Sequence, residues 1–112
     1  MINPNTLQID NRISYQGYVA TVTALATHFV HFCIDGEDHD SVRKYEDVDP
    51  LPITEERLRD AGFVEYPTGR FRLDHFVIDD RDHIYLGSTP LVRKGAWHDL
   101  QNLVRLISGK DI

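Results

Sequence analysis

The stretch of sequence that decides the fold is Pro50-Leu51-Pro52-Ile53-Thr54-Glu55-Glu56-Arg57-Leu58-Arg59-Asp60-Ala61-Gly62-Phe63. Thr54 is a good N-cap, because its hydroxyl can accept hydrogen bonds from backbone N–H groups that the first helical turn leaves unpaired. Gly62 can adopt the left-handed conformation that ends a helix, and Phe63 can then fold back on Leu58 in a Schellman motif. These signals predict a short helix over residues 54–61, which must be fixed by packing because two turns are too few to be stable alone.

The residues around this helix also have local roles. Pro50 and Pro52 favour an extended approach to it, and Ile53 has the spacing of a hydrophobic staple with Leu58. Glu55 would lie at the positive end of the helix dipole. We interpret the whole segment as a connection between two β units, so function is to be sought on other surfaces.

Length and composition indicate one domain. The chain has 112 residues, of which 41% are hydrophobic, enough to bury a core without disulfides or a metal. Cys33 is the single cysteine, and the first five residues carry neither a basic flank nor an apolar run. No stretch approaches the ~20 apolar residues that cross a bilayer. We expect a single domain over residues 1–112 in the cytoplasm, without contact with a membrane.

The negative charge is regional. The net charge is −6, and residues 35–60 hold ten acidic and four basic residues, which leaves eight of each elsewhere. This region would repel phosphate backbones, so nucleic acid is not the expected partner. It is either a solvated face or an acidic surface that engages a basic partner.

Short strands dominate the sequence up to the α-helix at its end. The region 10–49 is rich in β-branched and aromatic residues and predicts a curled, SH3-like antiparallel sheet with strands at 12–16, 18–25, 28–34 and 41–48. After the short helix, residues 63–87 predict a β-meander with strands at 63–66, 70–78 and 83–87. Tyr66-Pro67-Thr68-Gly69 fits a type I turn between the first two of these strands.

The last predicted element is an amphipathic helix over residues 96–108, with Gly109 as its left-handed stop. One half of the helix is apolar and should pack on a sheet, and it carries Trp97, Leu100, Leu103, Val104, Leu106 and Ile107. The other half carries His98, Asn102 and Arg105, which are either a contact surface or a solvated face. Trp97 is either a core anchor or part of an interface hot spot.

Two stretches together resemble an uncharacterised family of small proteins of Bacteroidota and their phages and mobile elements. The family motifs read PIPLTEE followed by GF, and HxLQNLYxxLTGxEL; this chain has PLPITEE with Gly62-Phe63, and HDLQNLVRLISG. The resemblance covers roughly residues 48–112, with Val104 at the usual aromatic position and Ser108 for Thr. It implies an architecture and a genomic context, and no catalytic residue. The motif positions are structural: Pro52, Thr54, Glu55, Leu58, Gly62, Phe63, Leu100, Leu103 and Gly109.

Metal-site chemistry is weakly indicated. His31 and Cys33 share a strand face but lack further spaced ligands. A richer cluster lies around the turn between the second and third predicted meander strands and contains His75, Asp79, Asp80, Asp82 and His83. In a tight hairpin over residues 79–82, His75 would face Leu86 and His83 would face Ile78, which puts the two histidines on opposite faces. Polar turn residues explain the acids without a metal, and we expect neither a metal nor a cofactor.

Catalytic motifs are lacking. The chain has neither a GxSxG elbow nor a phosphate-binding glycine loop, and Cys33 lies in an apolar strand. We therefore expect an α+β protein that acts as a small non-enzymatic interaction module of unknown partner. Two alternatives remain open: nucleic-acid association through a barrel face with Arg12, Tyr15, Tyr18, Arg70 and Arg72, and an acidic decoy of a nucleic-acid-binding protein. Edge strands and the last helix also offer surfaces for a homodimer.

Overall fold

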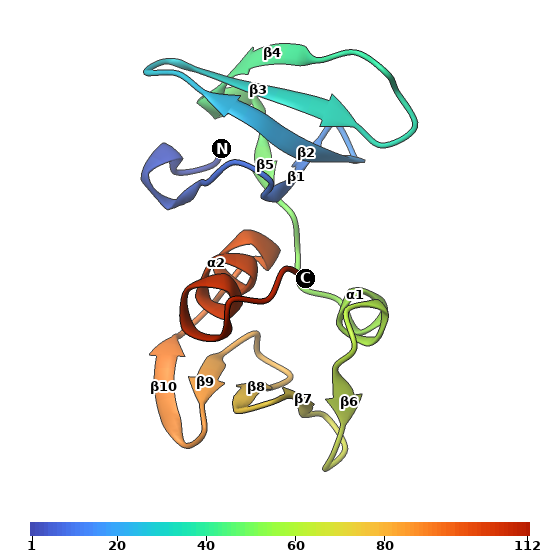
Figure 1. Ribbon diagram of the computed structural model, residues 1–112, viewed down its shortest axis with the longest axis vertical. Coiled ribbons are helices and arrows are strands. Elements are labelled where there is room, and N and C mark those ends of the chain that lie inside the picture. Colours follow the sequence, from blue (N-terminus) through green and yellow to red (C-terminus); the bar gives the residue numbers. More distant parts are fainter.

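The computed structural model describes residues 1–112 and has an α+β architecture with two antiparallel sheets and two α-helices (Figure 1). The elements in chain order are η1 (Pro4–Thr6), β1 (Arg12–Tyr15), β2 (Tyr18–Leu25), β3 (Phe29–Ile34), β4 (Ser41–Lys44), η2 (Tyr45–Asp47), β5 (Asp49–Pro50), α1 (Glu55–Asp60), β6 (Val64–Glu65), β7 (Phe71–Leu73), β8 (Phe76–Ile78), β9 (Ile84–Leu86), β10 (Thr89–Val92) and α2 (Trp97–Ser108).

The first sheet confirms the predicted curled SH3-like unit, with strand order β4-β3-β2-β1-β5. The predicted strand 41–48 is wrong in its second half, which forms the 3-10 turn η2. Tyr45 and Val48 are both buried, and the Tyr45 hydroxyl donates to the Ala26 carbonyl at 2.6 Å. Side chains three residues apart point to opposite faces of a strand but to the same side of a 3-10 turn, so only the turn buries both.

The second sheet has strand order β10-β9-β8-β7-β6. The predicted strand 70–78 is wrong as one strand, because it is a hairpin of β7 and β8 that turns at Asp74, whose φ is +52°. Phe71 and Phe76 are both buried, and their odd spacing would place them on opposite faces of a single strand. Strand β10 was not predicted, and its Pro90 is tolerated because an edge strand needs fewer N–H donors.

Helix α1 confirms the predicted start and stop. The Thr54 hydroxyl accepts from the Arg57 N–H at 3.2 Å. Gly62 has a φ of +97°, its N–H donates to the Arg59 carbonyl at 3.0 Å, and the Phe63 N–H donates to the Leu58 carbonyl at 2.9 Å. These two bonds are the Schellman pattern. The predicted staple is also present, since Ile53 and Leu58 are buried in one cluster.

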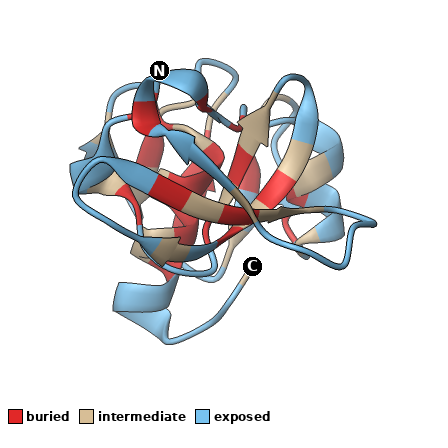
Figure 2. Ribbon diagram, turned by 90° about the horizontal axis from the view of Figure 1, so that it is seen from above, coloured by how far each residue is buried: buried red, intermediate tan, exposed pale blue.

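Each sheet has its own hydrophobic core, and α2 lies between the two sheets (Figure 1). Seen from the side of the first sheet, the buried residues lie along the middle of the strands and the connecting loops are exposed (Figure 2). The core of the first half contains Ile2, Leu7, Ile13, Ala20, Val22, Val30, Phe32, Tyr45 and Val48. The core of the second half contains Leu51, Ile53, Leu58, Phe63, Phe71, Phe76, Ile78, Ile84, Trp97, Leu100 and Val104.

The apolar half of α2 is only partly as predicted. Its first two turns bury Leu100 and Val104 against the second sheet, and Leu103 packs on the same cluster. Leu106 and Ile107 in the last turn are exposed, Leu106 to 82%. Gly109 ends the helix with a φ of +72°, as predicted.

Candidate functional site

The polar side of α2 joins the two halves of the molecule. The Asn102 amide donates to the Thr6 carbonyl at 2.9 Å and accepts from the Asn11 amide at 2.7 Å. Gln101 lies beside it, and its Oε1 accepts from the backbone N–H of Arg12 at 2.8 Å. Asn11 and Gln101 are buried, so their polar atoms depend on these partners. We call this contact, made by Thr6, Asn11, Arg12, His98, Gln101 and Asn102, the seam.

His98 is the most deeply buried polar residue of α2. Its Nε2 lies 2.9 Å from the Thr6 hydroxyl. That hydroxyl already donates its hydrogen to the Asn3 carbonyl at 2.7 Å. The ring must therefore donate from Nε2 to Thr6, and Nδ1 is left as a buried acceptor without a partner. Burial lowers the pKa of His98, although the Asp99 carboxylate at 3.6 Å acts in the opposite direction.

The predicted contact surface of His98, Asn102 and Arg105 is therefore corrected for two of its three residues. His98 and Asn102 face the first half of the molecule, so they are not free for a partner. Arg105 alone is exposed, and its Nε lies 3.7 Å from the Asp111 carboxylate. A helix enclosed between two sheets is buried on two sides. A sequence pattern with one apolar and one polar half indicates only one of these sides.

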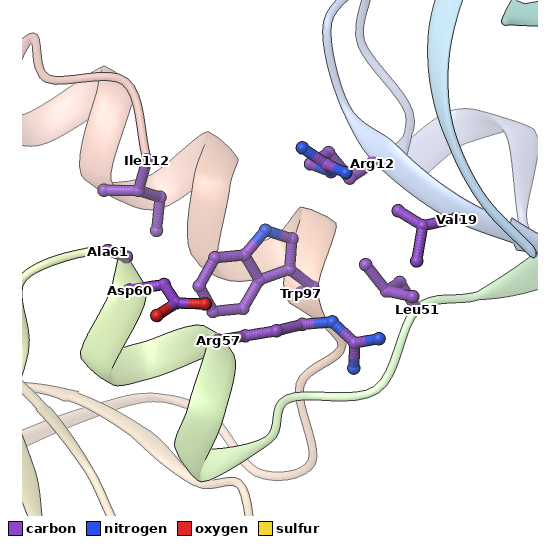
Figure 3. A pocket seen from close by; sticks show the side chains of 8 residues that line it. All are labelled: Arg12, Val19, Leu51, Arg57, Asp60, Ala61, Trp97 and Ile112. Carbon is purple, nitrogen blue, oxygen red and sulfur yellow. The ribbon is translucent and has the colours of Figure 1, made fainter. Parts of the chain in front are cut away.

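A cleft of about 290 Å³ opens beside the seam, where α1, the start of α2 and the strands β1 and β2 meet (Figure 3). Its apolar lining consists of Val19, Leu51, Ala61, Trp97 and Ile112. The backbone N–H of Trp97 donates to the Leu51 carbonyl at 2.8 Å, which joins the start of α2 to the connecting segment. Trp97 is 4% exposed and belongs to the second core, so the predicted core anchor is confirmed, and the same indole also lines the cleft.

Three charged side chains surround this apolar lining: Arg12, Arg57 and Asp60. Arg12 forms an ion pair with Asp35. Arg57 makes one side-chain hydrogen bond, to the Pro52 carbonyl at 2.9 Å, and takes part in no ion pair. The cleft therefore holds two guanidinium groups and one carboxylate on a chain whose net charge is −6.

The connecting segment itself supplies half of the cleft. Arg57, Asp60 and Ala61 have i, i+3, i+4 spacing, which places them on one side of α1, while Leu58 points into the second core. Pro52 and Glu55 of the motif are exposed, and Glu55 lies 3.5 Å from Arg59. Arg57 and Asp60 were not predicted as site residues, because the local signals of this segment are explained by the start and stop of a helix.

The acidic turn after β8 is an internally bonded structure. One Asp79 oxygen accepts from the backbone N–H groups of Arg81 and His83 at 3.0 and 2.9 Å, and the other lies 3.1 Å from His83 Nδ1. Burial works to raise the pKa of Asp79, but the hydrogen bonds from His83 and Arg81 outweigh it, so this pKa is lowered. Burial and the nearby Asp79 charge raise the pKa of Asp82.

The predicted register of this hairpin is wrong by one residue. The structure pairs Ile78 with Ile84 and Phe76 with Leu86, because five residues rather than four form the turn and Asp82 takes a φ of +61°. His75 lies in the turn between β7 and β8, because the predicted strand 70–78 is itself a hairpin. No group of three or more His, Cys, Asp or Glu side chains is placed to hold a metal ion; His31 and Cys33 share a partly buried strand face, as predicted.

The residues of the two alternative functions are divided between the halves. Arg12, Tyr15 and Tyr18 belong to the first sheet, whereas Arg70 and Arg72 lie at β7 of the second (Figure 1). They do not form the single barrel face that nucleic-acid association required. The acidic residues of 35–60 are divided in the same way between the β3–β4 loop, η2, β5 and α1, and several are in ion pairs, including those with Arg12, Lys44 and Arg59.

Comparison with known proteins adds no relative: no protein-family model, no curated protein and no solved structure matches the chain. No helix in the structure has both the length and the apolar character needed to cross a membrane.

Proposed function

We propose that the protein is a small non-enzymatic interaction module that binds a protein partner in the cleft between its two halves. The observation that carries this proposal is the Arg57 guanidinium. It lies beside the apolar lining formed by Leu51 and Trp97, with one backbone carbonyl as its only hydrogen-bond partner. Arginine beside an aromatic residue in a partly enclosed site is typical of binding hot spots.

The surroundings support this choice of surface. Arg59 pairs with Glu55 and Glu65, and Arg43 donates to the Tyr15 hydroxyl. Arg72, like Arg57, donates only to one backbone carbonyl, that of Tyr66. Arg57 differs from Arg72 because it lines a cleft together with apolar side chains. The genomic context of phages and mobile elements remains a proposal that rests on the sequence motifs alone. A homodimer is the other assembly that the exposed edge strands β4 and β10 would allow.

Affinity capture from the native host with three matched baits tests the proposal. We expect wild-type protein and Arg81→Gln, which changes an exposed arginine of the β8–β9 turn, to recover the same partner, and Arg57→Gln to lose it. Circular dichroism checks that all three baits are folded. Equal recovery by all three baits would place the partner on another surface, and turnover of a substrate without any specific partner would overturn the proposal.

A further inference from the structure

We infer that the cleft takes a peptide segment in which an aliphatic side chain lies next to a carboxylate. This inference rests on the proposed function and specifies the chemistry of the partner. The aliphatic side chain would lie against Val19 and Ala61, beside the small exposed part of the Trp97 indole, and the carboxylate would pair with the Arg57 guanidinium.

Hydrogen-bonding capacity points to an anion at Arg57. A guanidinium has five N–H donors in a planar fork that matches the two oxygens of a carboxylate. In this protein one of these donors is used, by the Pro52 carbonyl. The second guanidinium of the cleft, that of Arg12, is already neutralised by Asp35, so Arg57 is the group left to bind an anion.

Asp60 selects a carboxylate over a phosphate. It lines the same cleft and has no ion-pair partner of its own. A bound phosphate group carries about −1.5 to −2 charges near neutral pH, and it would be repelled by Asp60 more strongly than a carboxylate with a single charge. The acidic character of the chain adds to this difference.

The free apolar surface of the cleft is small. Its volume of about 290 Å³ lies at the lower end of the range of about 300 to 1,000 Å³ for small-molecule sites. Trp97 and Leu51 are 4% and 3% exposed, so the core already covers most of their surface. The half-buried Val19 and Ala61 are left to contact one aliphatic side chain, and a peptide supplies both that side chain and the neighbouring carboxylate.

Selection from a random peptide library on the wild-type protein tests this inference, with Arg57→Gln as the counter-target. Enriched peptides are then synthesised without tryptophan and titrated against the protein. Trp97 is the single tryptophan of the chain, so its fluorescence emission reports directly on the cleft. Each peptide is compared with two variants, one with the acidic residue changed to its amide and one with the aliphatic residue changed to Ala.

We expect the enriched peptides to share an aliphatic residue beside Asp or Glu and to change the Trp97 emission. Changing the acid to its amide should weaken binding to wild type about tenfold, the factor that one charge-assisted hydrogen bond contributes, and should have no effect on binding to Arg57→Gln. Arg57→Lys, which keeps the charge and loses the fork, should retain part of the discrimination.

Three results would overturn the inference. Peptides that change the Trp97 emission without needing an acidic residue would leave the cleft as the binding site but refute its preference for a carboxylate. Enriched peptides that leave the emission unchanged would refute the cleft itself, and with it the proposed function. Failure to enrich any peptide would show that a short segment is not enough for recognition.

Discussion

Asn102→Ala should destabilise the protein through the seam. Asn102 makes two strong hydrogen bonds across it, to the Thr6 carbonyl at 2.9 Å and from the Asn11 amide at 2.7 Å. The substitution leaves the amide hydrogens of Asn11 without an acceptor. Asn11 is 3% exposed, so water cannot replace the lost partner without opening the seam.

The size of the effect follows from these contacts. Leaving a buried polar group unsatisfied costs about 1–3 kcal/mol. The Asn11 oxygen loses a longer bond from the Asn102 amide at 3.3 Å but keeps the bond from the Gln8 N–H at 2.8 Å. We therefore expect a loss of about 2 kcal/mol in the free energy of unfolding. For a chain of 112 residues, an unfolding entropy of about 2.1 cal/mol/K per residue converts this loss to a decrease of about 8 °C in Tm.

Thermal and urea unfolding measure this change, with Asn5→Ala as the matched control. Asn5 is exposed, and its side chain has none of these contacts, so its removal should change stability by less than about 0.5 kcal/mol. Equal stability of Asn102→Ala and Asn5→Ala would refute the seam as a stabilising contact between the halves.

Three further predictions concern the seam and the helix ends. Burial lowers the pKa of His98 from 6.5, so the unfolded chain binds more protons than the folded one as the pH falls below about 6.5, and wild-type stability should decrease from pH 7 to pH 5. The stability of His98→Gln should decrease less over the same range. Equal decreases in the free energy of urea unfolding for the two proteins would contradict this. Gly95→Ala places a Cβ 2.6 Å from Ile84 Cδ1 and should lower the free energy of unfolding by about 1–3 kcal/mol. This loss should be smaller in an Ile84→Val background, because valine lacks that methyl group. An unchanged loss would argue against the clash. Thr54→Ala removes the N-cap of α1 and should lower the free energy of unfolding by about 1 kcal/mol, whereas Thr68→Ala, at an exposed loop position, should have no measurable effect.

Local chemistry made part of this fold predictable. The cap at Thr54 and the stop at Gly62 depend on neighbouring residues only, and both are present. Strands β1 to β3 were predicted nearly to the residue because β-branched and aromatic residues mark them clearly. The errors at Tyr45 and at Phe76 have one cause: side chains at odd spacing both turn inward, and the alternation of a single strand cannot accommodate them.

The cleft could not be predicted from local pattern. Its lining comes from positions between Arg12 and Ile112, and only the docking of the two halves brings them together. Arg57 is indistinguishable in the sequence from an ordinary solvated helix residue. His98 and Asn102 fall on the polar side of α2, and that side becomes buried because the first half presents Thr6 and Asn11 to it.

The most direct test of the central claim is an NMR titration of ¹⁵N-labelled protein with an enriched peptide that contains an aliphatic residue beside an acid. We predict that the indole N–H resonance of Trp97 and the side-chain Nε–H resonance of Arg57 shift together and saturate together. Arg57→Gln should abolish the shift of the indole resonance. Shifts confined to the exposed end of α2, at Leu106 and Ile107, with Trp97 and Arg57 unmoved, would contradict the assignment of the cleft as the binding site.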